Sequence, residues 1–115
     1  MSAKKPPVVM IHGAFTGPWV WGGFTAKFKS AGYKVHTPCL RHHEDQAASA
    51  SLAQLSLADY AADLALFLDE LGTPAILVGH SMGGLLVQML AARRKVAALV
   101  LLAPSAPWGV PPSTL

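Results

Sequence analysis

The chain has 115 residues, of which 52% are hydrophobic and 13% are charged, and its formal net charge is +3. This length predicts a single domain over residues 1–115, with a core at 7–103 and an irregular, proline-rich tail at 104–115. Because lysines and arginines are scattered along the sequence apart from those at 93–95, we expect no nucleic-acid partner. The high apolar content favours a surface that is buried against another protein.

Cysteine usage and the N-terminus are consistent with a cytoplasmic protein. The single cysteine, Cys39, excludes an internal disulfide and offers no paired thiols for zinc, so we predict no metal site and no cofactor. We interpret Cys39 as a small buried side chain. Residues 1–7 lack the apolar segment of a signal peptide, and no apolar run is long enough to span a membrane. We therefore expect no transmembrane segment.

The first part of the chain predicts two strands with one helix between them. The apolar run at 8–11 is typical of a parallel strand covered on both faces, and it ends in His12-Gly13-Ala14-Phe15. A helix is predicted from Gly17-Pro18 to a left-handed cap at Gly32. Its apolar stripe consists of Trp21, Phe24, Phe28 and Ala31. Residues 33–37 alternate and stop before a proline, which predicts an edge strand.

A polar loop and a second helix follow. Residues 39–51 have neither a helical nor a strand period, and they predict a loop that contains Arg41-His42-His43-Glu44-Asp45. A capping box of Ser56 and Asp59 predicts where the next helix starts, and a hydrophobic staple of Leu55 and Tyr60 predicts the same start independently. Glycine at 72 and proline at 74 predict its end.

The most informative stretch is Gly79-His80-Ser81-Met82-Gly83, which stands between apolar runs at 75–78 and 82–94. It predicts a strand, a sharp turn and a helix, with Ser81 where the backbone reverses and glycines where a Cβ would collide. A last buried-type strand is predicted at 96–102. The element order, β-α-β-α-β-α-β, predicts a three-layer α/β fold with a parallel sheet and a site at the carboxyl ends of its strands.

The motif around Ser81 resembles the nucleophile elbow of the α/β-hydrolase family, and His12-Gly13-Ala14-Phe15 resembles the loop after the first strand in that family. The resemblance covers nearly all of residues 8–107 and only the N-terminal half of the family fold. It implies a truncated α/β-hydrolase fold with its strands in the order second, first, third, fourth. With Trp19 and Trp21, the first motif looks most like the methyl esterase and hydroxynitrile-lyase branch of these esterases and lipases.

The resemblance also implies roles for individual residues. Ser81 would be the nucleophile, and the backbone N–H groups of Ala14 and Met82 would donate to the oxyanion that forms on an ester carbonyl. The substrates would be small, apolar, uncharged esters. Their pocket would be lined by Phe15, Trp19, Met82 and Trp108.

The histidines before Ser81 receive different interpretations. By the same resemblance, His12 would brace its loop through hydrogen bonds, and His80 would point away from the site and be structural. His36 lies within the second predicted strand, which favours a scaffold role. No acid or base follows the nucleophile, because residues 82–115 contain no Asp, Glu or His. The family's chain order of serine, acid and then histidine therefore has no counterpart here.

Three explanations for the missing base stay open. First, an upstream histidine, His42 or His43, replaces it, with Glu44 or Asp45 to orient the ring, because their loop opens at the same sheet edge as Ser81. The other interpretation of that loop is a solvated segment, or a chance grouping of residue types that bind metals. Second, another chain completes the site. Third, the chain is a catalytically impaired or non-catalytic module, derived from a truncated hydrolase, that binds a small ligand or dimerises.

The predicted strand at 96–102 would be an apolar sheet edge without a charge or a bulge, which natural proteins seldom leave bare. We expect a homodimer through this strand or its flanking helices. Antiparallel pairing of two such strands puts the partner's site at the opposite edge, so it favours a base from the same chain. The sequence thus predicts a dimeric serine esterase or lipase that forms an acyl-enzyme on Ser81.

Overall fold

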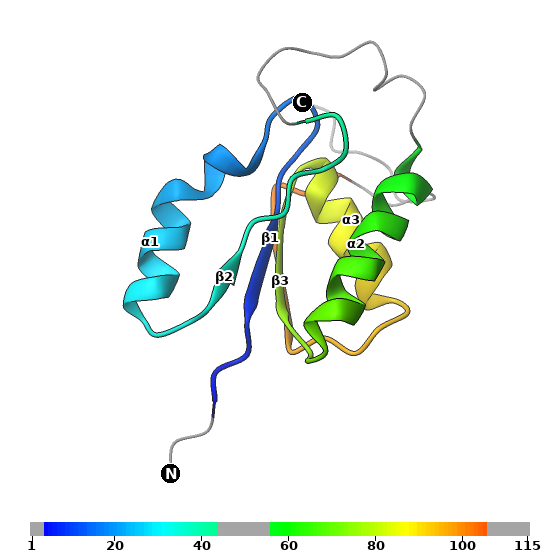
Figure 1. Cartoon of the computed structure of the whole chain (residues 1–115). Helices are drawn as coiled ribbons and strands as arrows, with labels where there is room; N and C mark the ends of the chain where they lie inside the picture. Colours follow the sequence, from blue (N-terminus) through cyan, green and yellow to red (C-terminus); the bar gives the residue numbers. More distant parts are fainter. Residues whose placement is uncertain (1–3, 44–55, 106–115) are drawn as a thin grey trace.

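In a computed structural model, the described residues, 4–43 and 56–105, form one sheet with helices on both faces (Figure 1). The strands are β1 (Val8–Ile11), β2 (Val35–His36), β3 (Ile76–His80) and β4 (Ala98–Leu102). They lie in the order β2-β1-β3-β4, and every neighbouring pair is parallel. The predicted α/β fold and the predicted strand order are confirmed.

The three layers follow from the alternation of side chains along the strands. Helix α1 (Gly22–Ser30) lies on one face of the sheet, and α2 (Leu57–Leu71) and α3 (Met82–Ala91) lie on the other (Figure 1). Val9 and Ile11 belong to the core cluster that includes residues of α2 and α3, whereas Val8 and Met10 belong to the cluster on the α1 side. The two clusters together hold the sheet in place between its helices.

The first predicted helix differs from the structure at its start. Pro18–Trp21 forms a 3-10 turn, η1, and the α-helix begins only at Gly22. Trp21 is buried and Phe28 is half-buried against the same core cluster, but Phe24 is 49% exposed and Ala31 is exposed, so the predicted apolar stripe is wrong at these two positions. Because a 3-10 turn has about 3 residues per turn, it rotates Trp21 out of the register that α-helical spacing assigns.

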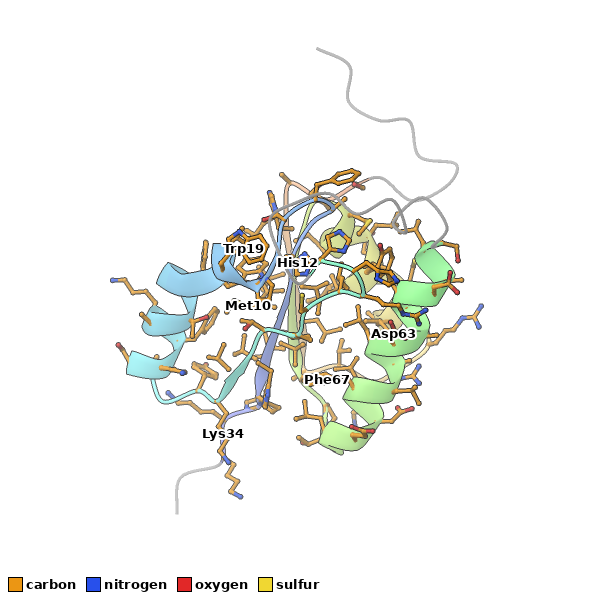
Figure 2. All side chains as sticks on the ribbon, turned by 45° about the horizontal axis from the view of Figure 1, so that its top comes forward. Met10, His12, Trp19, Lys34, Asp63 and Phe67 are labelled. Carbon is orange, nitrogen blue, oxygen red and sulfur yellow. The ribbon has the colours of Figure 1, made fainter. Side chains whose placement is uncertain are left out.

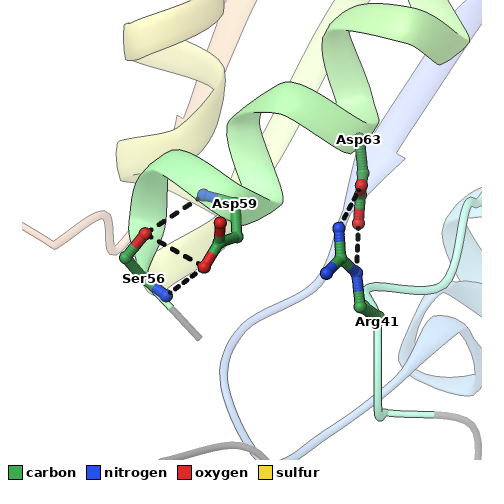
Figure 3. Close-up of polar contacts among 4 residues, drawn as sticks. All are labelled: Arg41, Ser56, Asp59 and Asp63. Atoms are coloured by element: carbon green, nitrogen blue, oxygen red, sulfur yellow. Dashed lines mark hydrogen bonds and ion pairs between the residues drawn. The ribbon is translucent and has the colours of Figure 1, made fainter. Parts of the chain in front are cut away.

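The start of α2 has the predicted capping box (Figure 3). The Ser56 hydroxyl accepts a hydrogen bond from the Asp59 N–H at 3.2 Å, and the Ser56 N–H donates to the Asp59 carboxylate at 2.8 Å. These contacts satisfy backbone donors that a helix start otherwise leaves without partners. The predicted end is confirmed too, since Gly72 has a left-handed φ of 74°. Leu55, the other half of the predicted staple, lies outside the described residues.

Two further predictions need correction. Helix α3 ends at Ala91 and does not continue to 94, and Arg94 instead pairs with Asp69 of α2 at 3.0 Å. Cys39 is exposed, so its interpretation as a buried side chain is wrong. The buried position in that loop belongs to Leu40, which is only 2% exposed.

Strand β4 is apolar but not buried. Leu99, Val100 and Leu101 are each between 38% and 40% exposed, and successive residues of a strand point to opposite faces. Both faces of β4 are therefore open to solvent, which contradicts the prediction of a buried-type strand, because β4 lies at an edge of the described sheet. None of the helices within the described ranges is long and apolar enough to cross a membrane.

Candidate active site

Ser81 stands at the turn between β3 and α3, with φ 56° and ψ −120°. A positive φ is strained for a residue with a side chain. The described part of the chain has four such non-glycine residues, and each follows the carboxyl end of a different strand. They are Phe15 after β1, His42 after β2, Ser81 after β3 and Ala103 after β4. Backbone strain is thus concentrated at one edge of the sheet, the edge at which functional sites of parallel α/β folds occur.

Two glycines allow the close crossing of β3, α3 and β1 at this turn. A Cβ on Gly79 would lie closer than 3.0 Å to the carbonyl oxygen of Gly83, and a Cβ on Gly83 would lie closer than 3.0 Å to the carbonyl of Ile11. No larger residue fits at either position without moving the backbone. The predicted sharp turn is confirmed, and its glycines are required by contact between backbones.

Hydrogen bonds fix the backbone of Ser81. Its N–H donates to the carbonyl of Leu102 at 3.2 Å, and its carbonyl accepts from the N–H groups of Gly84 and Ser105, both at 2.9 Å. The serine is therefore tied to the start of α3 and to the end of β4. Its side chain is half-buried, and within residues 4–43 and 56–105 its hydroxyl makes no hydrogen bond.

His12 is fully buried and makes two hydrogen bonds. Its Nε2 accepts from the N–H of Leu40 at 3.0 Å, and its Nδ1 donates to the carbonyl of Gly13 at 2.8 Å. This pairing fits the neutral ring with its proton on Nδ1. Burial lowers the pKa of His12, and the nearby His43 lowers it further. The predicted bracing role of His12 is confirmed, because its ring joins the loop after β1 to the loop after β2.

The loop after β1 lies directly against Ser81. A Cβ placed on Gly13 would be 3.1 Å from Cβ of Ser81 and 3.6 Å from its Oγ. Ala14 is the next residue, and Met82 is the first residue of α3. Among the described residues, the N–H groups of Ala14 and Met82 donate to no turn or loop carbonyl, so both donors are available to an added acceptor.

His43 is buried, at 3% exposure, and lies between two other rings. The ring centroids are 5.3 Å from His12 and 5.7 Å from Tyr60. Its Nδ1 is 3.1 Å from the carbonyl of Arg41, and its Nε2 is buried with no hydrogen-bond partner. The structure contains no hydrogen bond between His43 and Ser81 in its described parts. The interpretation of this loop as entirely solvated is wrong for His43.

His42 is half-buried and has a left-handed φ of 65°. The two residues that were predicted to orient either histidine, Glu44 and Asp45, lie outside the described residues. His80 is exposed at the end of β3, and His36 is half-buried, with its ring 5.7 Å from that of Phe67. These positions agree with the prediction that His36 is part of the scaffold.

The predicted pocket residues that the structure describes lie near the same edge. Phe15 and Trp19 are 71% and 44% exposed, and Figure 2 shows Trp19 and His12 at the end of the molecule that is opposite to Lys34. Exposed rings of this size are available to pack against an apolar ligand. Trp108 lies outside the described residues, so its predicted place in the pocket stays a prediction.

The loop after β2 is held by contacts that sequence reasoning missed. The guanidinium of Arg41 contacts the carboxylate of Asp63 on α2 through two hydrogen bonds, at 3.0 and 2.6 Å (Figure 3). Tyr60, from the first turn of the same helix, packs on His43. Arg41 and Asp63 are far apart in sequence, so no local pattern indicates their contact.

Comparisons with known proteins agree with this geometry. A family model described as the alpha/beta hydrolase family matches residues 8–115. Methyl jasmonate esterase 1 of Vitis vinifera is 36% identical over 95 residues, which are 77% of this chain and 34% of the esterase. A pimeloyl-[acyl-carrier protein] methyl ester esterase of Aromatoleum aromaticum is 36% identical over 104 residues, which are 89% of this chain and 38% of that enzyme.

Solved structures give the same result. A thioesterase domain from the curacin biosynthetic pathway superposes with a TM-score of 0.79 at 29% identity, over 92% of this chain and 40% of that one. A methylesterase from Arabidopsis gives a TM-score of 0.76 at 27% identity, and the match covers 90% of this chain and 45% of the methylesterase. The chain thus spans between a third and a half of the length of these relatives. On its strand order, its strained serine turn and these matches, the chain belongs to the α/β-hydrolase family.

Proposed function

We propose that the chain takes part in the hydrolysis of small, apolar carboxylic esters through an acyl-enzyme on Ser81. The observation that carries the proposal is the strained turn of Ser81, packed so closely against the loop after β1 that a Cβ placed on Gly13 would be 3.1 Å from Cβ of Ser81. The curated relatives named above are methyl ester esterases, which supports an ester with a small alcohol group. Exposed aromatic rings at the same edge favour uncharged substrates.

The proposed reaction has two halves. The Ser81 hydroxyl oxygen attacks the ester carbonyl carbon while a base takes its proton, and the resulting oxyanion accepts hydrogen bonds from the N–H groups of Ala14 and Met82. The C–O bond to the alcohol then breaks, the alcohol leaves with the proton, and a water molecule hydrolyses the acyl-serine. Each oxyanion donor is worth about 3 kcal/mol of activation free energy in such sites.

His43 is our first choice for the base, and His42 is the second. If the Nδ1 of His43 donates to the carbonyl of Arg41, its Nε2 carries a lone pair, and that atom has no donor in the structure. A base needs such an unprotonated nitrogen within hydrogen-bond reach of the serine hydroxyl. The His43 ring lies beside that of His12, whose neighbour Gly13 adjoins Ser81, so this choice requires a shift of the loop that brings Nε2 within hydrogen-bond reach of the Ser81 hydroxyl.

A homodimer through β4 would complete the sheet. The exposed apolar residues of β4, which include Val100, have no covering strand in the described parts of the chain, and such edges usually find a partner.

The second candidate function is a non-catalytic module that binds a small apolar ligand or dimerises. It is favoured by the Ser81 hydroxyl, which lacks a hydrogen bond to any described base.

Covalent labelling distinguishes the two functions. A fluorophosphonate probe is expected to modify the folded chain once, and Ser81→Ala is expected to abolish the modification. Ser30→Ala, which changes an exposed serine of α1, is the matched control and should label like the wild type. Intact-mass spectrometry measures the adduct. A folded wild-type chain that stays unmodified would contradict the hydrolase proposal and leave the binding module.

Turnover of a short methyl or p-nitrophenyl ester tests the choice of base. We expect His43→Ala to lower kcat by about 10²–10⁴-fold, the usual contribution of a general base, and His42→Ala to have the smaller effect. His36→Gln, at a ring that contacts Phe67 rather than His12, is the control. Circular dichroism checks that each variant folds. If the double variant of His42 and His43 turns over like the wild type, the base comes from elsewhere.

A further inference from the structure

A cavity lies at the amino-terminal ends of the strands, away from Ser81. It has a volume of about 830 Å³. We call it the amino-end cavity, and it is lined by Lys4, Lys5, Pro6, Pro7, Gly32, Lys34, His36, Leu71, Thr73, Pro74, Lys95, Val96 and Ala97. The segments that precede all four strands contribute to it, and Lys34 points outward at this end in Figure 2. Its volume falls in the range of small-molecule sites.

The fold gathers positive charge in this cavity. Lys4, Lys34 and Lys95 come from three separate segments, and in the described residues none of them forms an ion pair. Among residues 4–43 and 56–105, no aspartate or glutamate lines the cavity. Asp69 lies near this end of α2, but its carboxylate is already held by Arg94 at 3.0 Å. Three lysines therefore line one cavity, and its described lining residues include no carboxylate to balance them.

A purely structural role accounts for only one of the lysines. Lys5 donates to the carbonyl of Ala31 at the end of α1 and lies over the ring of Tyr33 at 4.8 Å, so its ammonium group caps a helix end. Lys34 and Lys95 lie beyond the last turns of α1 and α3 and make no such contact. Lysine side chains that repel one another gain by binding a shared anion.

We propose that the amino-end cavity binds an organic phosphate, with the phosphate group among Lys4, Lys34 and Lys95. A phosphate monoester carries about −1.5 to −2 charges near neutral pH, which is complementary to several lysines that line one cavity. The apolar part of the ligand lies against Pro7, Leu71 and Val96, which form an uncharged wall of the same cavity. This site is separate from Ser81, so it does not depend on the proposed hydrolase activity.

Isothermal titration calorimetry of the full chain tests the site, with inorganic phosphate, hexyl phosphate and pyrophosphate as probes. We expect hexyl phosphate to bind more tightly than inorganic phosphate, because only the former uses the apolar wall. Replacing two cavity lysines, Lys34→Gln with Lys95→Gln, is expected to weaken hexyl phosphate binding by about fivefold or more. The matched control, Lys27→Gln with Lys29→Gln, removes two exposed lysines of α1 that do not line the cavity.

The outcomes separate the alternatives. Equal weakening in both double variants, or no binding of hexyl phosphate at low millimolar concentration, would overturn the proposal. Equal affinity for inorganic and hexyl phosphate would contradict the proposal that the ligand is organic and that its apolar part contacts the cavity wall. A single-stranded 20-mer oligonucleotide and phosphatidylserine vesicles complete the series, and tighter binding of either one through Lys34 and Lys95 would replace the small-molecule site by a macromolecular one. Fluorophosphonate labelling of Ser81 should be unchanged in the lysine variants.

Discussion

At the scale of single residues, His12 determines how the two loops beside Ser81 are arranged. Its ring is fully buried, yet both nitrogens have backbone partners, Leu40 on one side and Gly13 on the other. A buried polar group stabilises a fold only when it is hydrogen-bonded in this way. Protonation of Nε2 would remove the acceptor for the Leu40 N–H and place a charge in the core.

This arrangement predicts that the protein loses stability in mild acid. Burial lowers the pKa of His12 below its ordinary value of 6.5, so the unfolded chain binds the proton at a higher pH than the folded chain. The free energy of unfolding therefore falls as the pH drops below 6.5 toward the lower folded pKa, and the His12 contribution is fully present above 6.5. Urea unfolding between about pH 5 and pH 7.5 measures the slope.

His12→Gln supplies the comparison for that measurement. The variant should be less stable than the wild type at neutral pH, because glutamine cannot reproduce both hydrogen bonds of the ring. Its stability should also vary less with pH, since the titrating imidazole is gone. An identical pH dependence in the two proteins would show that another group is responsible.

The residues of the site differ in how far sequence alone predicts them. Ser81 and His12 stand in local motifs, so their positions follow from a few neighbouring residues. The burial of His43 does not, because it depends on Tyr60 of α2 and on His12, which are distant in the sequence. The gathering of Lys4, Lys34 and Lys95 is equally non-local, and in the sequence these lysines look scattered.

At the scale of elements, the contact among β1, β3 and α3 sets the position of the nucleophile. Gly83, in the first turn of α3, approaches the carbonyl groups of Ile11 and His12 so closely that a Cβ would lie closer than 3.0 Å to the oxygen of Ile11. Backbone atoms of β1, a central strand, cannot move independently of the hydrogen bonds that join it to β2 and β3. The start of α3 is therefore held against the end of β1.

Gly83→Ala is expected to destabilise the fold by about 3 kcal/mol, because the added methyl group overpacks a backbone contact. Gly23→Ala is the matched control, since a Cβ there meets no atom within 4 Å in α1. In a helix, alanine is favoured over glycine by about 0.5–1 kcal/mol, so the control should stabilise the protein. Urea unfolding distinguishes the two, and a similar free energy for both variants would contradict the predicted close contact.

Local signals predict some element boundaries and miss others. The start of α2 was predictable because Ser56 and Asp59 satisfy each other's backbone donors without help from the rest of the fold. The 3-10 turn at Pro18–Trp21 was not, because four residues are too short a stretch for a sequence pattern to distinguish 3-10 from α-helical spacing. The exposure of β4 depends on which other elements cover that end of the sheet, and a local sequence pattern cannot predict this.

At the scale of the whole molecule, the parallel sheet gives the protein two chemically different ends. The carboxyl ends of the strands carry the strained residues, which include Ser81, and the amino ends carry the lysines of the amino-end cavity. Because all the strands run in one direction, residues that precede a strand and residues that follow it can never share a site.

The proposed homodimer makes a prediction at this scale. Light scattering after size exclusion should give twice the chain mass of 12.1 kDa at micromolar concentration. Val100→Lys places a charge on the exposed strand β4 and should convert the dimer to a monomer. Leu66→Lys, on an exposed position of α2 that is remote from the edge strand, is the control and should leave the dimer intact. A monomeric wild type would contradict dimerisation through β4.

The hydrogen bonds that join Ser81 to the chain around the end of β4 connect the sheet edge to the nucleophile. The N–H of Ser81 is bonded to Leu102, and its carbonyl to the N–H of Ser105. A strand that paired with β4 would therefore be connected, through Leu102, to the peptide groups of the serine itself. By thermodynamic reciprocity, a ligand that binds at Ser81 must change the association constant of β4 by the same factor by which that association changes the ligand's affinity.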